Sequence, residues 1–286
     1  MVPCPTSTAA GNPAHARRQR IVAAGRMSDM CTLTLGWRVF DDAPVVVAAN
    51  RDERLGRPSE PPAVTGGDPS VLAPRDAEAG GTWIGANEHG VLAAITNRWA
   101  DVPGGGDRSR GLLVRDVLDA ASTHEAREVV DDALGTHTYE GFNLIVAEVG
   151  GAATPGDPTA LYVEWDGDLH VRRLDAGIHV VVNVGIDGEY VEPGREPRRG
   201  AEQAANATRL RDTLRPTVGE PMSTWRSRAA EVLGDHDYGV CVHDPERGFG
   251  TRSSSLFTLH ADGTVDVRFA DGPPCETAFR RVEGQL

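Results

Sequence analysis

The sequence predicts an α+β fold in which antiparallel sheets are covered by helices. Two observations predict it. Runs of expected strands alternate along the chain with pairs of expected helices, and no Pro/Ser-rich linker divides the sequence. This order is typical of antiparallel sheets with helices on their faces. Residues 30–286 are therefore expected to form one domain, and residues 1–29 to be either a disordered tail or the product of a start codon assigned too early.

The strands are predicted from alternating apolar and polar residues. This pattern begins at Cys31 and runs to residue 39. The segment 41–44, Asp-Asp-Ala-Pro, predicts a turn, and residues 45–49 then form a second strand. Further strands are expected at residues 82–86, 91–96, 142–149, 160–165, 169–174, 179–183, 238–243, 253–260 and 265–269.

Two pairs of helices are expected between the groups of strands. The first pair follows Ser109, and its second helix opens with Ser122 and Glu125, which are spaced as in a capping box. The second pair is expected at residues 200–214 and 223–233. The helix pairs thus separate three runs of strands.

Composition excludes several classes of function. The net charge is −13, and all 29 basic residues are arginine, a balance that disfavours nucleic acids and anionic membranes as partners. The acidity fits either a salt-adapted host or a basic partner. The sequence contains no apolar run of about 18 residues, so no integral membrane segment is predicted. It also contains no nucleotide-binding motif, so no cofactor is predicted.

The four cysteines show no CxxC spacing, so we expect reduced thiols and a cytoplasmic location. His236, Cys241 and His243 lie close together in the sequence. Cys241 and His243 share a strand face that could suit a metal or a haem iron, but we favour two polar residues on an ordinary strand, and no metal site is predicted.

Hairpin geometry places a polar segment beside Cys31. In an antiparallel pair with its turn near residues 41–42, Cys31 faces residues 51–53. Asn50, Arg51, Asp52 and Glu53 therefore lie near Cys31. Charged groups at the end of an apolar strand are costly to bury unless they are paired. The segment is either part of a site or a solvated strand end.

Met30 precedes Cys31 directly. Translation from Met30, followed by removal of the initiator, would give Cys31 both a thiol and a free α-amine. The α-amine titrates at about 7.7–8.0 and could accept the thiol proton without a separate histidine. Arg51 would favour the thiolate. The alternative is that Cys31 is a small buried strand residue.

Six segments in this order resemble the NRDE family, also called the Transport and Golgi organisation family. The resemblance runs from Met30 nearly to the end of the chain. The segments are Met-Cys-Thr-Leu at 30–33, Ala-Asn-Arg-Asp-Glu at 49–53, Gly-Gly-Thr-Trp-Ile-Gly at 80–85, Gly-Val-Leu-Ala-Ala-Ile-Thr-Asn at 90–97, Gly-Phe-Asn-Leu at 141–144 and Gly-Thr-Arg-Ser-Ser at 250–254.

That family is similar to the Ntn hydrolases, which include cysteine-type penicillin and bile-salt amide hydrolases. The resemblance implies a four-layer αββα sandwich, with Cys31 as nucleophile and Asp52 as the acid that holds its amine. It also implies oxyanion-site amides at Asn97 and Asn183. The full predicted catalytic set is Cys31, Arg51, Asp52, Asn97, Asn183 and Arg252, and the predicted substrate-binding set is Asn50, Glu53, Trp83 and Asn143.

Two functions follow from this resemblance. The first is hydrolysis of small acyl amides or thioesters by Cys31. The second is a non-catalytic carrier of a hydrophobic ligand, either haem or an acyl chain, because animal relatives are linked to haem trafficking. A fold alone does not decide between a hydrolase and a carrier.

Overall fold

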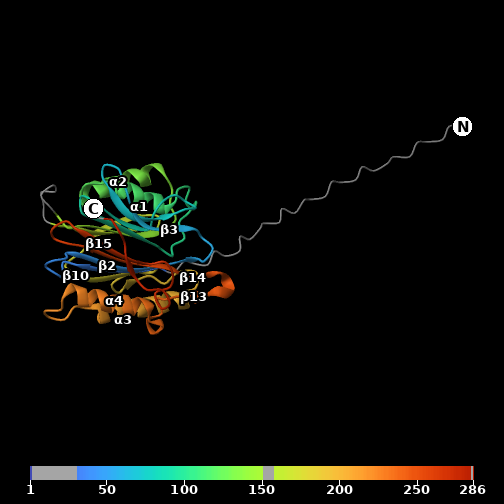
Figure 1. Ribbon diagram of the computed structural model, residues 1–286. Coiled ribbons are helices and arrows are strands. Elements are labelled where there is room, and N and C mark those ends of the chain that lie inside the picture. The colour runs from blue at the N-terminus through green and yellow to red at the C-terminus, as the bar shows by residue number, and fades with distance from the viewer. Residues whose placement is uncertain (2–30, 151–157, 285) are drawn as a thin grey trace.

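The computed structural model describes residues 31–150 and 158–284, together with Met1 and Leu286. The expectation for residues 1–29 concerns a segment that lies outside this description, apart from Met1. The described chain forms four layers, with two sheets packed face to face and a helix pair on each outer face (Figure 1). The predicted α+β class and its αββα layer order are confirmed.

The first sheet contains the amino end of the described chain and the carboxyl-terminal strands. Its strand order is β12-β11-β10-β1-β2-β14-β15-β16, with β13 paired to β14. The strands are β1 (Cys31–Trp37), β2 (Val45–Arg54), β10 (Gly177–Val182), β11 (Gly185–Ile186), β12 (Glu189–Tyr190), β13 (His243–Asp244), β14 (Phe249–Leu259), β15 (Val265–Ala270) and β16 (Arg280–Arg281).

The second sheet is an antiparallel meander in chain order from β3 to β9. Each strand pairs with the one that follows it, so every connection within this sheet joins neighbours. The strands are β3 (Ser59–Thr65), β4 (Val71–Asp76), β5 (Ile84–Asn87), β6 (Val91–Asn97), β7 (Phe142–Glu148), β8 (Ala160–Trp165) and β9 (Leu169–Arg173).

The helices cover the outer faces. Helices α1 (Arg110–Val117) and α2 (Thr123–Thr136) pack on the second sheet, and α3 (Pro197–Leu214) and α4 (Met222–Gly234) pack on the first (Figure 1). Ser109 caps α1 and Ser122 caps α2, each accepting a backbone N–H bond, as helix N-termini require. Short 3₁₀ turns, η1 (His236–Tyr238) and η2 (Pro245–Arg247), flank β13.

Alternation along the central strands divides the apolar residues between two cores. On β2, Val45 and Val47 enter the core between the sheets, whereas Val46 and Ala48 enter the core under α3 and α4. These central strands are buried on both faces, so they hold the end of the β1–β2 hairpin in a fixed position.

The predicted strands and helices are present with shifted ends, except at one place. Residues 238–243 do not form the predicted strand. Residues 236–238 form η1 and only His243–Asp244 pairs with β14. Strands β3 and β4 were not predicted. Among the described residues, no helix is both long and apolar enough to cross a membrane.

Candidate active site

The hairpin of β1 and β2 sets Cys31 directly opposite Arg51. This is one of the residues that antiparallel pairing predicted to face Cys31. Arg51 also pairs with Ser253 on β14, next to a bulge between Thr251 and Ser253. The bulge lies where strands often redirect side chains beside functional sites. Three adjacent strands therefore fix the backbone around Cys31.

A cavity of about 130 Å³ opens at Cys31. It brings together residues from both sheets and from the start of α1. Its lining contains six of the predicted site residues, which are Cys31, Arg51, Asp52, Glu53, Trp83 and Asn97. The unpredicted lining residues include Arg57, Asp76, Thr82, Ile95, Ser109, Arg110 and Gly111.

Arg51 is held as a buried cation at the wall of this cavity. Its guanidinium carbon lies 4.2 Å from the ring centroid of Trp83, a cation–π contact, and its Nη2 lies 3.6 Å from Glu53 Oε2 and 3.7 Å from Asp76 Oδ2. Burial lowers the pKa of Arg51, and the negative charges of Glu53, Cys31 and Asp76 raise it in part. Trp83 thus stacks on Arg51.

Asp76, on the unpredicted strand β4, anchors this cation network. Its Oδ2 lies 2.8 Å from both Nε and Nη2 of Arg57, and its Oδ1 accepts N–H bonds from Glu78 and Ala79. Burial alone would raise the pKa of Asp76, but these donors outweigh it and hold the pKa below its ordinary value. The carboxylate is therefore charged at neutral pH.

Asp52 is 2% exposed. Its Oδ1 accepts a 2.6 Å hydrogen bond from Thr251 Oγ1, and its backbone oxygen lies 3.9 Å from Cys31 Sγ. A buried carboxylate needs such partners because desolvation penalises its charge. The hydroxyl of Thr251 thus holds the Asp52 side chain next to the Cys31 strand end.

Asn183 contacts the backbone nitrogen of Cys31. That nitrogen donates a 3.0 Å hydrogen bond to Asn183 Oδ1, which also accepts from Gln203 Nε2 at 2.8 Å. Asn183 Nδ2 donates to the backbone oxygen of Asn97 at 2.7 Å. Asn183, predicted to lie near the oxyanion site, thus binds the nitrogen of Cys31 and supports Asn97, which is the amide that lines the cavity.

A close approach of two backbones shapes the cavity floor. A Cβ atom on Gly81 would lie 2.2 Å from the carbonyl carbon of Gly111, so only glycine fits at position 81. Thr82 N donates to Gly111 O at 3.0 Å in the same contact. The start of α1 is thereby brought against the start of β5, which explains the glycine at position 81.

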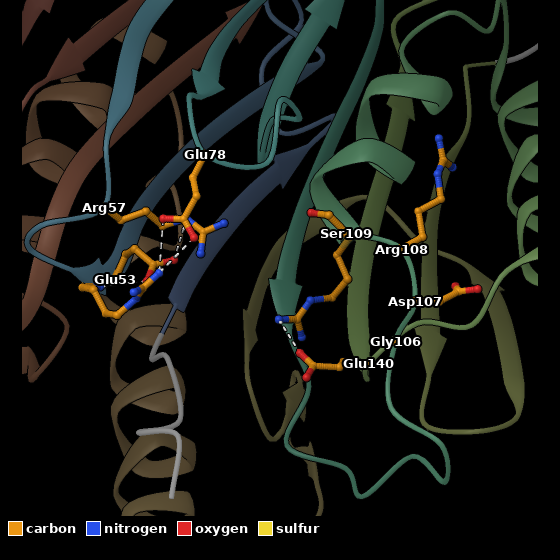
Figure 2. Close-up of a pocket in the computed structure, with 10 residues that line it drawn as sticks. Glu53, Arg57, Glu78, Gly106, Asp107, Arg108, Ser109 and Glu140 are labelled. Atoms are coloured by element: carbon orange, nitrogen blue, oxygen red, sulfur yellow. Dashed lines mark hydrogen bonds and ion pairs between the residues drawn. The ribbon is translucent and has the colours of Figure 1, made fainter. Parts of the chain in front are cut away.

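The cavity at Cys31 continues into an outer cavity of about 520 Å³ that shares Glu53, Arg57, Ser109 and Arg110 with it. Figure 2 shows Glu53, Arg57 and Glu78 on one side and Arg108, Ser109 and Glu140 across the opening. Opposite charges pair along both walls, including Arg54 with Glu78 and Arg110 with Glu140. The mouth of the site is therefore polar.

Asn50, a predicted substrate-binding residue, is not among the residues that line the cavity at Cys31. It is 2% exposed, and its Nδ2 donates to the backbone oxygens of Leu233 and Val240. Its Oδ1 accepts from Ser254 Oγ at 2.5 Å. The side chain instead ties β2 to β14 and to the end of α4.

Asn143, also predicted to bind substrate, is internal and is not among the residues that line this cavity. It is 1% exposed, and its amide donates to Thr96 Oγ1 and to the backbone oxygen of Val182, both at 3.1 Å. Tyr162 donates its hydroxyl proton to Asn143 Oδ1 at 2.7 Å. Asn143 therefore joins the two sheets.

Arg252, a predicted catalytic residue, is not among the residues that line the cavity at Cys31. It occupies the β14 bulge, and its Nη1 lies 3.0 Å from Asp271 Oδ1. The bulge leaves it without a ladder partner on β2, so its side chain reaches the end of β15.

Sequence comparisons identify the family of the chain. Residues 30–270 match the family model described as Transport and Golgi organisation 2. The chain belongs to that family. A relative from Bos taurus, "Transport and Golgi organization protein 2 homolog", is 31% identical over 252 residues, covering 79% of this chain and 88% of the relative.

Two solved structures have similar folds at low sequence identity. One is a Caenorhabditis elegans N-acylethanolamine-hydrolyzing acid amidase ortholog, with a TM-score of 0.49, 15% identity, and coverage of 81% of this chain and 93% of that chain. The other is a conjugated bile acid hydrolase variant from Clostridium perfringens, with a TM-score of 0.49, 12% identity, and coverage of 89% and 97%.

Proposed function

We propose that this family member is a hydrolase of small acyl amides or thioesters in which Cys31 is an amino-terminal nucleophile. The observation that carries the proposal is the position of Cys31. Its thiol borders a cavity beside a buried arginine, while its backbone nitrogen is held by Asn183. A nucleophile with an adjacent, oriented base is the arrangement that covalent catalysis requires.

The reaction begins with transfer of the Cys31 thiol proton to its own α-amine. The thiolate attacks the acyl carbon, and the tetrahedral intermediate collapses as the carbon–nitrogen or carbon–sulfur bond to the leaving group breaks. The ammonium returns its proton to that leaving group. Water then attacks the acyl-thioester, the amine accepts its proton, and the carboxylic acid leaves as the thiol reforms.

Arg51 and Asn97 would stabilise the negative charges that develop during the reaction. The Arg51 guanidinium would stabilise the thiolate, and Trp83, Glu53 and Asp76 hold it in place. Asn97 is the amide that lines the cavity with Cys31, so it is our candidate for the oxyanion donor. Removing such a donor typically costs about 100- to 1000-fold in turnover.

The lining of the outer cavity indicates the kind of substrate. It consists of charged residues with Ser109 and Gly106, whereas sites for hydrophobic ligands are lined mainly by apolar and aromatic side chains. Trp83 and Ile95 supply apolar surface only in the inner cavity. This supports a short acyl group beside Cys31 and a polar group at the mouth, and it gives the haem-carrier alternative no support.

The test screens acyl amides and acyl thioesters in parallel with a haem titration, on two forms of the protein. One form begins at Cys31 and the other retains the residues before it. We expect turnover only in the form with a free Cys31 amine, and its loss in Cys31→Ser.

Equal turnover by both forms would remove the α-amine from the mechanism. Saturable haem binding without turnover, unchanged by Cys31→Ser, would contradict the hydrolase and favour the carrier.

A further inference from the structure

Four side chains with metal-binding atoms converge away from the Cys31 cavity. His236 comes from η1, Cys241 from the loop that follows, His243 from β13, and Cys275 from the chain after β15. Their ligand atoms all lie within 4.8 Å of one another. Cys241 and His243 were expected on an ordinary strand at residues 238–243, but only His243 lies in a strand there, and Cys275 joins the group from 32 residues beyond His243.

Three of these ligand atoms are spaced close to the edge lengths of a coordination tetrahedron. Cys241 Sγ lies 3.5 Å from Cys275 Sγ and 3.6 Å from His243 Nε2, and that nitrogen lies 3.2 Å from Cys275 Sγ. Zinc bonds of about 2.0–2.3 Å to nitrogen and sulfur imply ligand–ligand edges of about 3.3–3.8 Å. The two sulfurs and one nitrogen therefore already surround a single point.

The fourth ligand lies beside the other three. The rings of His236 and His243 have centroids 5.1 Å apart and planes inclined at 61°, so they contact each other edge to face. Gly234, at the end of α4, lets the Cys275 segment approach, because a Cβ there would lie 3.1 Å from Cys275 N. The fold thus brings two separate chain segments together at this position.

We propose that His236, Cys241, His243 and Cys275 bind one zinc ion as a closed structural site. Two thiolates and two imidazoles are a donor set that suits tetrahedral zinc, and four protein ligands leave no position open for a substrate. The site would cross-link the segment after α4 to the segment after β15. The proposal of this zinc site does not rest on the proposed hydrolase activity.

The zinc site would also brace one side of the active site. Val242, between two of the ligands, donates its N–H to Thr251 Oγ1 and accepts from Thr251 N, both at 2.8 Å. Thr251 Oγ1 in turn donates to Asp52 Oδ1. A metal that fixes this loop would therefore hold Thr251, and through it Asp52, in position.

The test uses the full chain purified without a polyhistidine tag. We expect one equivalent of zinc by elemental analysis. After removal of zinc with a chelator, titration with Co²⁺ should give the visible bands of a tetrahedral site and a thiolate charge-transfer band. Cys275→Ser and His243→Ala replace exposed ligands, so these variants should fold, and each should weaken zinc binding by more than about 100-fold.

Matched controls separate this site from other thiols and histidines. The Cys4→Ser, Cys31→Ser double variant and His124→Ala, an exposed residue of α2, should bind zinc as the natural chain does. Chelation should lower the Tm of the natural chain and leave that of Cys275→Ser unchanged.

Two results would overturn the proposal. One is the absence of saturable Zn²⁺ and Co²⁺ binding by folded protein, or binding that Cys275→Ser leaves intact. The other is a Cys241–Cys275 disulfide in protein that was alkylated on lysis under native conditions.

Discussion

The backbone nitrogen of Cys31 donates a hydrogen bond to Asn183 Oδ1 across 152 residues of sequence. Asn183 also accepts from Gln203 on α3 and donates to the backbone oxygen of Asn97 on β6. One buried amide thus joins the proposed nucleophile, the helix layer and the second sheet. If the Cys31 nitrogen is the catalytic base, Asn183 sets its orientation.

Asn183→Asp should shift the pH dependence of turnover. A carboxylate beside the amine favours the ammonium form and raises the pKa of the amine. The base is then protonated up to a higher pH, so the acidic limb of kcat/KM should move to higher pH. Asn87→Asp is the matched control, because Asn87 is equally buried and also bonds to backbone groups. A pH profile shifted equally in both variants would count against the assignment.

Arg51→Met should slow alkylation of Cys31 by iodoacetamide. Loss of a nearby guanidinium removes charge stabilisation from the thiolate, and each 1.4 kcal/mol lost corresponds to about tenfold in rate. Arg54→Met is the control, since Arg54 lies on the same strand end with its side chain 60% exposed. Peptide mapping of the natural chain should show Cys31 labelled before the buried Cys241. An unchanged rate in Arg51→Met would show that Arg51 serves packing alone.

Asp52→Asn should damage the site more than the fold. The amide oxygen still accepts the Thr251 hydrogen bond, so the free energy of unfolding should change by about 1 kcal/mol or less. Cys31 labelling and turnover should both fall, because the carboxylate no longer stabilises the ammonium that forms when the Cys31 amine accepts the thiol proton. Thr251→Val provides the contrast, since it leaves the buried carboxylate without this donor and should cost about 1–3 kcal/mol. A large stability loss in Asp52→Asn with unchanged thiol reactivity would make Asp52 structural.

Asp76 should contribute to acid sensitivity. Its pKa is held below the ordinary value in the folded protein, so its stabilising effect is present above the unfolded pKa of about 3.9 and is lost as pH falls through the folded value. Asp76→Asn should therefore reduce stability near neutral pH and flatten its decline below about pH 4. Chemical unfolding at several pH values measures this, with the exposed Asp119→Asn as control. An unaltered slope in Asp76→Asn would contradict the assigned pairing with Arg57.

Local patterns were sufficient to predict the hairpin that carries Cys31. Antiparallel pairing around a short turn fixes which residues face each other, so residues 51–53 could be placed opposite Cys31 from the turn position alone, and Arg51 is the observed partner. The same reasoning missed β3, an exposed edge strand that contains two prolines. Such a strand lacks apolar alternation. The neighbouring strand β4 was not predicted either, so Asp76, which lies on β4 and anchors Arg51, was missed with it.

Residue type did not reveal which asparagines face the cavity. Asn50 and Asn143 lie in apolar strands and looked like site residues, but each satisfies backbone carbonyls from distant segments. These partners, Leu233 and Val182, are set by tertiary packing. Cys275 was missed for the same reason, because its neighbours Cys241 and His243 lie more than 30 residues away. The spacing of residues along the sequence gives no information about such long-range contacts.

The central claim is that Cys31 is acylated during turnover. The most direct measurement is intact-mass and peptide-mass analysis of the mature protein, quenched in acid within one turnover of an acyl thioester. We expect one acyl group on the peptide that begins with Cys31; it should disappear as the free acid is released and should be absent from Cys31→Ser. Turnover without an acyl group on that peptide, or turnover of equal rate by Cys31→Ser, would contradict it.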